Sequence, residues 1–298
     1  MMPTFILLGA PRSGTTSVYH YLRQHPAIVM SFIKETQFFT YLASRTLADP
    51  VVTNVPWPAR SLNEYQALFE AREGVKAVGE ATPMYMYVPG VPGQIKALVP
   101  DVRLFCILRN PVERAYSGYL KNIREGVEDR TFEQAIRDEL SGKSTIVQSQ
   151  NYYVRTGLYY GHLLRFLEHF DRGRFCIYFY DDLLRSPREF MHTMFTDLGI
   201  DPDFLPDTSI RFNRGGIPPI KKDPRMNAWK PLILRVRRLL PPRHNLSLYR
   251  FQMWMQEKIL KVPPMSRATG DFLRDLYVDD IRQLQQLTGR DLAGWLGG

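Results

Sequence analysis

Thr4-Phe-Ile-Leu-Leu-Gly-Ala-Pro-Arg-Ser-Gly-Thr-Thr-Ser-Val-Tyr-His-Tyr21 is the stretch that decides the fold. Its apolar run from Phe5 to Leu8 is typical of a strand buried on both faces. A turn with Gly9 and Gly14 follows, and Thr15 opens a helix with one apolar face. This order of strand, glycine turn and helix directs backbone N–H groups and the positive end of the helix dipole at an anion. The stretch therefore predicts a phosphate-binding loop.

The loop differs from that of nucleotide triphosphatases in the position of its cation. The spacing of Gly9 and Gly14 fits the P-loop pattern, but Thr15 stands where those enzymes carry lysine. The positive side chain is Arg12, inside the loop. We therefore expect a phosphate site that is not an ordinary ATP site. The less favoured alternative is a buried strand that ends in an ordinary tight turn.

Composition limits the class of protein. The chain has 298 residues, and no apolar run approaches the roughly 20 residues of a membrane span. The amino terminus has neither a basic region nor a long apolar segment, so we expect no signal peptide. Cys106 and Cys176 lie inside apolar runs, which favours buried, reduced thiols. Together these features favour a cytoplasmic protein.

The net charge of +9 indicates anionic ligands: a nucleotide, an acidic glycan, nucleic acid or a membrane surface. Basic residues crowd the segment 221–243, where Asp223 is the single acidic residue. Two interpretations stay open for this segment, a surface that binds a polyanion and a basic helix face exposed to solvent.

Strand and helix patterns alternate along the chain. Apolar runs predict buried strands at 103–108 and 174–180, with shorter candidates at 27–33 and 76–79. Helices are expected after Pro111, from the capping box of Thr131 and Gln134, over 158–170, from the Ser186 cap to Leu198, and over 271–287. The alternation predicts an α/β fold with a P-loop-type central parallel β-sheet flanked by helices and a helical C-terminal extension. We expect a single domain over residues 1–298.

The amphipathic C-terminal helix is expected to pack on the rest of the domain. Its predicted core contacts are Phe272, Leu276, Ile281 and Leu284.

A second anion site is predicted at the end of the 103–108 strand. In a parallel sheet, ligands bind beyond the carboxyl ends of the strands. Arg109 follows this strand and Ser117 lies two turns into the next helix, so a guanidinium fork and a hydroxyl can hold a second phosphate. The alternative, in which Arg109 pairs with Glu113 and Ser117 only packs, stays open.

These residues carry a resemblance to the sulfotransferase superfamily. Pro11-Arg-Ser-Gly-Thr-Thr16 resembles its 5′-phosphosulfate loop, and Leu108-Arg-Asn-Pro111 with Ser117 resembles its 3′-phosphate motif. Lys34-Glu-Thr-Gln-Phe-Phe39 is similar to a motif of the heparan-type and bacterial carbohydrate branches. Segments 157–163 and 289–292 also fit that branch, so the resemblance covers nearly the whole chain.

The resemblance implies the donor 3′-phosphoadenosine 5′-phosphosulfate and the product adenosine 3′,5′-bisphosphate. It implies in-line transfer of a sulfuryl group to a hydroxyl or amine, with no metal required, because positioning and charge stabilisation carry such a step. Arg12 would stabilise the departing phosphate. The implied donor contacts are Arg12, Ser13, Gly14, Thr15, Thr16, Arg109 and Ser117, with Arg214 and Gly215 by a looser analogy. The acceptor is expected to be a carbohydrate, a glycolipid or a lipid-linked sugar, and a small metabolite stays open as an alternative. Nucleic acid is not expected, and contact with a membrane surface stays open.

The resemblance also implies that Glu35 is the general base. Phe38 and Phe39 are expected to desolvate its carboxylate, which favours a base. Lys34, a further catalytic candidate, would oppose that effect with its charge, and a structural salt bridge of Glu35 stays open. The heparan-type enzymes carry lysine where this chain has Ala81, so one cationic contact is missing. His20, His25 and His162 are weaker candidates, and His162 is expected to be structural.

Two rival functions remain at this stage. Phe179-Tyr-Asp-Asp182 ends an apolar strand in acidic residues, as the metal-holding strand of a P-loop kinase does. The basic segment 221–243 would suit a non-catalytic protein that binds polyanions.

Overall fold

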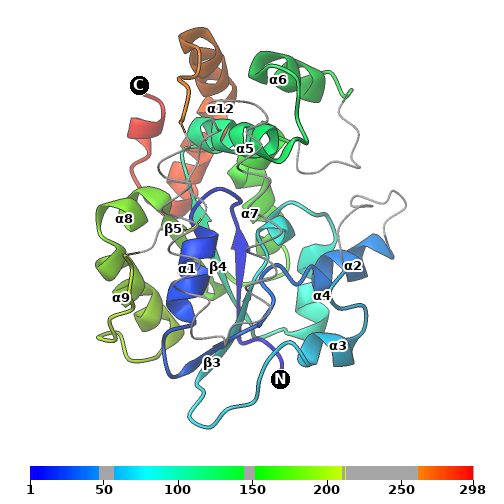
Figure 1. Ribbon diagram of the computed structural model, residues 1–298, viewed down its shortest axis with the longest axis vertical. Coiled ribbons are helices and arrows are strands. Elements are labelled where there is room, and N and C mark those ends of the chain that lie inside the picture. The colour runs from blue at the N-terminus through cyan, green and yellow to red at the C-terminus, as the bar shows by residue number, and fades with distance from the viewer. Residues whose placement is uncertain (47–56, 144–151, 210–211, 213–260, 298) are drawn as a thin grey trace, which may run out of the picture.

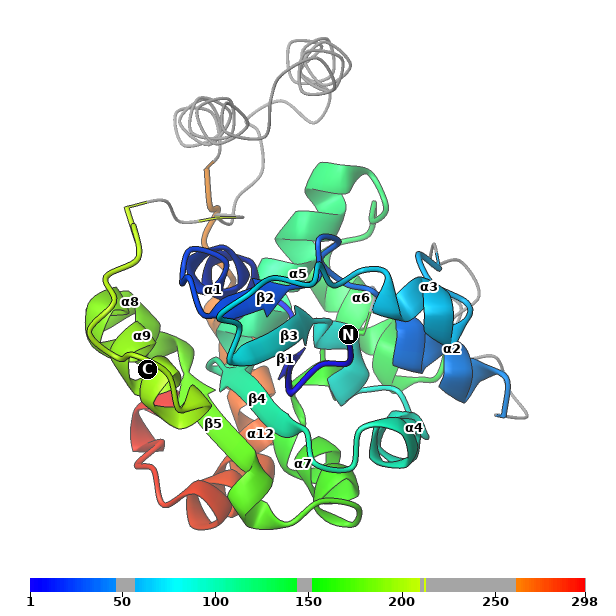
Figure 2. The ribbon, with the colours of Figure 1, turned by 90° about the horizontal axis from the view of Figure 1, so that it is seen from below.

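The computed structural model describes residues 1–46, 57–143, 152–209, 212 and 261–297. At its centre is a parallel sheet with the strand order β2-β3-β1-β4-β5 (Figures 1 and 2). The strands are β1 (Phe5–Gly9), β2 (Ile28–Met30), β3 (Ala77–Ala81), β4 (Arg103–Leu108) and β5 (Phe175–Phe179). The predicted α/β fold with a parallel sheet is confirmed, and the stretch that opens the chain forms its middle strand.

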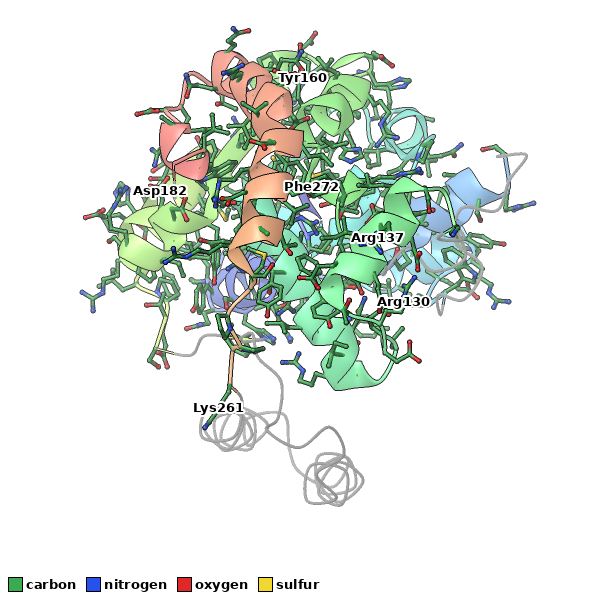
Figure 3. All side chains as sticks on the ribbon, turned by 90° about the horizontal axis from the view of Figure 1, so that it is seen from above. Arg130, Arg137, Tyr160, Asp182, Lys261 and Phe272 are labelled. Atoms are coloured by element: carbon green, nitrogen blue, oxygen red, sulfur yellow. The ribbon has the colours of Figure 1, made fainter. Side chains whose placement is uncertain are left out.

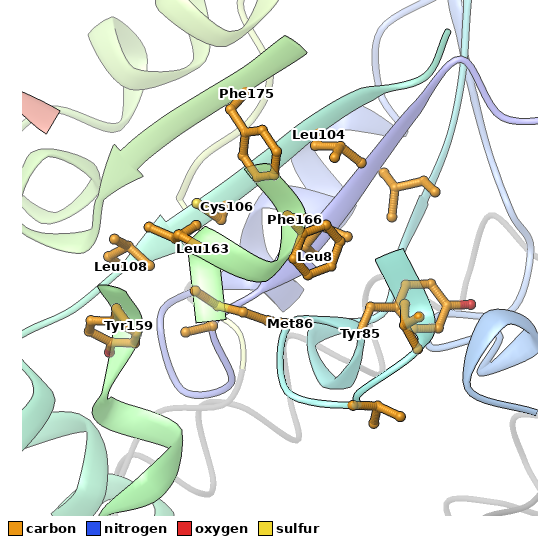
Figure 4. Close-up of a cluster of buried hydrophobic side chains, with 14 of the residues drawn as sticks. Leu8, Tyr85, Met86, Leu104, Cys106, Leu108, Tyr159, Leu163, Phe166 and Phe175 are labelled. Carbon is orange, nitrogen blue, oxygen red and sulfur yellow. The ribbon is translucent and has the colours of Figure 1, made fainter. Parts of the chain in front are cut away.

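Alternate residues of the strands enter two separate cores, one on each face of the sheet. In β1, Ile6 and Leu8 face the first core, whereas Phe5 and Leu7 face the second. Figure 4 shows the first core, where Leu8 and Cys106 lie close to helix α7. Helices α2 (Phe38–Ser44), α3 (Leu62–Gln66), α4 (Val91–Leu98), α5 (Pro111–Glu125), α6 (Phe132–Leu140), α7 (Tyr159–Leu167) and α12 (Arg267–Thr288) contribute to the first core. Helices α1 (Thr15–Leu22), α8 (Tyr180–Arg185) and α9 (Pro187–Leu198) contribute to the second.

Short 3₁₀ segments complete the described part of the chain. They are η1 (Pro83–Met86), η3 (Arg155–Gly157), η4 (Arg172–Arg174) and η6 (Ala293–Trp295). Within the described residues, no helix combines the length and the apolar character needed to cross a bilayer. The basic segment 221–243 lies outside the described residues.

Local sequence signals mark the starts of α6 and α9 correctly. The predicted capping box is present in α6, where Thr131 and Gln134 bond each other's backbone. In α9, the Ser186 hydroxyl accepts from the Glu189 N–H, and the helix ends at Gly199 with φ 69°. Helices α2 and α8 were not predicted, because α2 has an N-cap residue without a side-chain bond and α8 begins directly at the end of β5.

The C-terminal helix packs as expected except at one position. Ile281 and Leu284 are buried, and Leu276 packs at the edge of the first core. Phe272 is 48% exposed, so its predicted core contact is wrong (Figure 3). The buried stripe runs through Leu273 instead, and one residue along a helix turns the side chain by about 100°.

Both cysteines are free thiols, as expected. Cys106 is fully buried in β4, and Cys176 is partly buried in β5. Burial raises the pKa of the Cys106 thiol, so this side chain is an inert part of the core.

Candidate active site

The loop between β1 and α1 has the backbone of an anion cradle. Gly14 precedes α1 with φ 83°, and a Cβ there would lie 2.7 Å from the Cδ2 atom of Leu183. Arg12 is also left-handed, with φ 69°, which is uncommon for a residue with a side chain. Among the described residues, no side chain caps the first turn of α1. Its early N–H groups therefore suit a bound anion.

A first cavity of about 490 Å³ opens over this loop. Its polar side is formed by Arg12, Gly14, Thr15, Thr16, Arg109 and Ser117. These six residues were predicted from two motifs that lie about a hundred residues apart in the sequence. The structure brings them together because β1 and β4 are neighbouring parallel strands whose carboxyl ends meet.

Direct hydrogen bonds connect the two motifs. The Arg12 Nε donates to Ser117 Oγ at 3.1 Å, and an Arg109 terminal nitrogen donates to the Arg12 carbonyl at 3.2 Å. Arg109 also lies over the ring of Tyr180, 4.8 Å from its centroid. Its Nε and its other terminal nitrogen donate to Glu113 Oε2 at 3.2 and 2.9 Å. The ion pair that was the alternative for Arg109 is therefore present within the same cavity wall.

The charge of the first cavity is strongly positive around Arg12. Burial, followed by the positive charges of Arg124 and Arg109, lowers the pKa of the Arg12 guanidinium to about 10. The group remains protonated at neutral pH. An anion beside Arg12 would offset this repulsion, so the cavity favours a negatively charged ligand.

The apolar part of the lining of the first cavity was not predicted. Leu120, Val262, Met265 and Phe212 lie there. The Phe212 N–H donates to Ser17 Oγ at 3.0 Å, and its ring stacks on His20 with centroids 4.0 Å apart. Phe212 follows an irregular, proline-rich stretch, so no periodicity signals it. A flat apolar group such as a nucleobase fits this wall.

A second cavity, of about 470 Å³, adjoins the first. Arg12, Thr15 and Thr16 line both. Other residues that line the second cavity are Lys34, Glu35, Gln37, Arg114, Lys121, Asn122, Tyr152, Tyr153 and Thr156. The predicted base and the predicted phosphate loop thus face the same space.

Glu35 is held on a left-handed turn, with φ 64°. Its N–H donates to the Ala81 carbonyl at 3.0 Å, and its carboxylate lies 2.5 Å from the Lys34 ammonium. The Glu35 side chain is 46% exposed, so the expected desolvation by Phe38 and Phe39 is wrong. Both rings point into the first core, where Phe38 stacks on Tyr65.

Two buried polar residues of the second cavity have atoms that lack partners. Gln37 and Arg114 are 4% and 3% exposed. Within the described part of the chain, the Gln37 Oε1 and the Arg114 Nε form no hydrogen bond. Buried acceptors and donors of this kind are rare unless something satisfies them.

Some predicted site residues lie elsewhere. Ser13 is fully buried and is not among the described residues that line either cavity; its N–H donates to the Ala10 carbonyl. Ala81 packs in the second core and brings no charge to the site. Arg214 and Gly215 lie outside the described residues.

Two of the histidine candidates have structural surroundings. His25 is buried, and its Nε2 bonds the Asp201 carbonyl at 3.1 Å. The His162 Nε2 bonds the Arg155 carbonyl at 2.8 Å, and its Nδ1 bonds Arg165 at 2.6 Å. Burial lowers the pKa of His162 to about 4, so the ring is neutral and accepts from Arg165.

The acidic pair that suggested a kinase has another role. Asp181 accepts from the Trp295 indole at 3.0 Å, and Asp182 pairs with Arg290 and Arg185. Neither carboxylate is among the described residues that line the two cavities. The pair instead ties the C-terminal segment to α8.

Comparisons with known proteins find a matching family. Residues 2–211 match the family described as the sulfotransferase domain. Heparan sulfate glucosamine 3-O-sulfotransferase 3A1 of Mus musculus is 26% identical over 298 residues, which cover 99% of this chain and 65% of that protein. The membrane-associated sulfotransferase kil1 of Dictyostelium discoideum is 30% identical over 159 residues, 51% of this chain and 31% of its own. This chain thus spans less than two thirds of either relative.

A solved structure agrees over the full length. The crystal structure of a sulfotransferase from Alicyclobacillus acidocaldarius superposes with a TM-score of 0.73, covers 99% of both chains and is 24% identical, which supports the fold. The family match covers well over half of the chain, and so this protein belongs to the sulfotransferase family.

Proposed function

We propose that this protein transfers a sulfuryl group from 3′-phosphoadenosine 5′-phosphosulfate to a hydroxyl or amine of a carbohydrate acceptor. The observation that carries the proposal is the meeting of two cavities at Arg12, Thr15 and Thr16. One cavity has the cationic and apolar walls that a nucleotide needs, and the other carries a carboxylate. A transfer between two bound substrates requires this arrangement, because the reacting atoms must meet in line.

The first cavity is assigned to the donor. Gly14, Thr15 and Thr16 bind the 5′-phosphate through N–H and hydroxyl groups at the start of α1. Arg109 and Ser117 bind the 3′-phosphate. The hydrogen bond from Arg12 Nε to Ser117 Oγ supports this assignment, because one nucleotide can reach both of the motifs that this bond joins.

The second cavity is assigned to the acceptor. The acceptor oxygen or nitrogen attacks sulfur and forms a new bond to it, while the bond from sulfur to the 5′-phosphate oxygen breaks. Glu35 takes the proton from the attacking group, and Arg12 offsets the charge that develops on the departing phosphate. The Lys34 ammonium lies 2.5 Å from the Glu35 carboxylate and brings a positive charge to the same cavity.

A carbohydrate suits the polar atoms of the second cavity. A sugar hydroxyl both donates and accepts, so it can satisfy the Gln37 Oε1 and the Arg114 Nε. The name of the mouse relative, heparan sulfate glucosamine 3-O-sulfotransferase 3A1, supports the same class.

Calorimetry tests the donor assignment. Adenosine 3′,5′-bisphosphate should bind at least about tenfold more tightly than ADP, because a charge-assisted fork to the 3′-phosphate contributes about 1.5–3 kcal/mol. Arg109→Gln should remove most of this difference. Equal affinities for the two nucleotides in the unaltered protein would contradict the roles of Arg109 and Ser117.

An acceptor panel tests the reaction. Incubation with ³⁵S-labelled donor and a set of desulfated polysaccharides, glycolipids and simple sugars should identify an acceptor that gains label. Glu35→Gln should then lower turnover about 100-fold or more while the affinity for adenosine 3′,5′-bisphosphate stays within about twofold. Loss of nucleotide binding in this variant would instead make Glu35 a structural residue.

A further inference from the structure

Glu80 is a fully buried carboxylate beside the proposed active site. It lies in β3, one residue before Ala81, and is 0% exposed. Thr36 Oγ1 and Thr82 Oγ1 donate to its Oε2 at 2.5 and 2.8 Å. The hydroxyl groups of Tyr65 and Tyr85 donate to its Oε1. Within the described residues, the carboxylate has hydroxyl donors but no salt bridge.

A buried carboxylate without a neighbouring cation destabilises a folded protein, so the four hydroxyl groups that surround Glu80, here called the hydroxyl cage, require an explanation. Burial raises the pKa of Glu80, and the four hydroxyl bonds oppose that rise. The donors come from separate parts of the chain: the 34–37 turn, α3, the end of β3 and η1. The cage therefore fixes several segments relative to one another rather than one local turn.

The segment most in need of support is the turn around Thr36. Glu35 and Gln37, on either side of it, have φ values of 64° and 55°. Left-handed residues with side chains persist only where the surrounding structure holds them, and they gather at functional sites. The Thr36 hydroxyl donates to Glu80, accepts from the Phe38 N–H at 3.4 Å and lies 2.9 Å from the Tyr85 hydroxyl oxygen, and so it is the central fixed point of this turn.

We infer that Glu80 is a positioning residue: through Thr36 it holds the left-handed turn that presents the Glu35 carboxylate to the second cavity. Glu80 is not among the described residues that line either cavity, so it acts through Thr36 and not on the substrates. The turn is fixed at its other end by the bond from the Glu35 N–H to the Ala81 carbonyl, the residue next to Glu80. The inference rests on the proposed role of Glu35.

Two threonine variants form a matched test. Thr36→Val and Thr82→Val each remove one hydroxyl from the same Glu80 oxygen with little change in volume. Only Thr36 belongs to the turn that carries Glu35. Thr36→Val should speed amide exchange at Glu35 by about tenfold or more and lower kcat by about tenfold or more, since small misplacements of a reacting group are costly. The affinity for adenosine 3′,5′-bisphosphate should stay within about twofold.

Thr82→Val should leave both amide exchange at Glu35 and kcat within about twofold of the unaltered protein, even where its melting temperature falls as much as that of Thr36→Val. Thr36→Ser, which keeps the hydroxyl, should restore the behaviour of the unaltered protein. Equal effects of Thr36→Val and Thr82→Val would overturn the inference and leave Glu80 as a general structural residue. Unchanged exchange in Thr36→Val would overturn it as well.

Amide exchange separates this inference from the proposed function. It is measured on the protein alone and with adenosine 3′,5′-bisphosphate, so it needs no acceptor. If no acceptor in the panel gains label, the proposed function fails while the exchange data still decide whether Glu80 holds the Glu35 turn. If exchange fails to distinguish the variants while turnover is observed, the proposed function stands and the role of Glu80 falls.

Discussion

Glu113 competes with the ligand that we assign to Arg109. Two nitrogens of the Arg109 guanidinium donate to Glu113 Oε2, at 2.9 and 3.2 Å, and the third donates to the Arg12 carbonyl. A 3′-phosphate can form a fork with Arg109 only when Glu113 gives up at least part of this pair. Glu113→Gln should therefore tighten the binding of adenosine 3′,5′-bisphosphate.

The size of the effect follows from exposure and distance. The Glu113 side chain is 57% exposed and that of Arg109 is 19% exposed, so solvent weakens their pair. An exposed ion pair contributes at most about 1 kcal/mol. Removal of the Glu113 charge also removes its repulsion of the phosphate, which is about 1 kcal/mol for two unit charges about 4 Å apart in water. Because the lost ion pair and the lost repulsion are not independent, we expect the binding free energy to improve by about 1–1.4 kcal/mol, which is five- to tenfold tighter binding.

Calorimetry with two nucleotides and two variants checks this reasoning. ADP lacks the 3′-phosphate, so its affinity should change less than about twofold in Glu113→Gln. Asp101→Asn makes the same change of charge in an exposed pair with Arg174, away from both cavities, and should alter neither affinity. Equal tightening of both nucleotides would show a general charge effect, and no tightening would refute the competition at Arg109.

Two further substitutions test the packing. Asp280 accepts from the Tyr160 N–H at the start of α7, and burial raises the pKa of Asp280 to about 6. Because the folded protein favours the protonated carboxyl group, the stability that Asp280 contributes is present at about pH 4 and is lost as the pH rises through 6. The Asp280→Asn side chain does not titrate, so at pH 7 the free energy of unfolding of this variant, measured with denaturant, should exceed that of the unaltered protein by up to about 3 kcal/mol. The difference should shrink toward pH 4. A difference that does not depend on pH would contradict the burial argument. Gly79 in β3 has no room for a side chain, because a Cβ would lie 2.1 Å from the Phe5 ring, and Gly79→Ala should lower the unfolding free energy by about 3 kcal/mol. Phe5→Leu should recover part of that loss in thermal melts, and no recovery would place the clash elsewhere.

The middle of the fold was predictable because its signals are local. The apolar runs of β1 and β4 are continuous, as strands buried on both faces must be. Loop, helix and cap residues follow them within a few positions. Parallel strands also bring their carboxyl ends to one edge of the sheet. Because β1 and β4 are neighbours, Arg109 at the end of β4 lies close to the loop that follows β1.

The parts that sequence reasoning missed depend on tertiary contacts. The role that we assign to Glu80 depends on hydroxyl groups from separate segments of the chain. No sequence pattern indicates that Thr36 and Tyr65 contact the same carboxylate. Phe212 forms a cavity wall through its contacts with α1 rather than through any local pattern. Phe38 and Phe39 were assigned to the wrong environment, because neighbours in sequence on a turn need not face the same space.

The loop cation connects the two cavities of the site. An arginine at position 12, rather than a lysine at position 15, lies between the two cavities and lines both. Its Nε donates to Ser117 and its carbonyl accepts from Arg109, so both proposed contacts of the 3′-phosphate hold the residue that lines both cavities. Both bonds are present while Arg109 is paired with Glu113, so the protein holds Arg12 in place before any nucleotide binds.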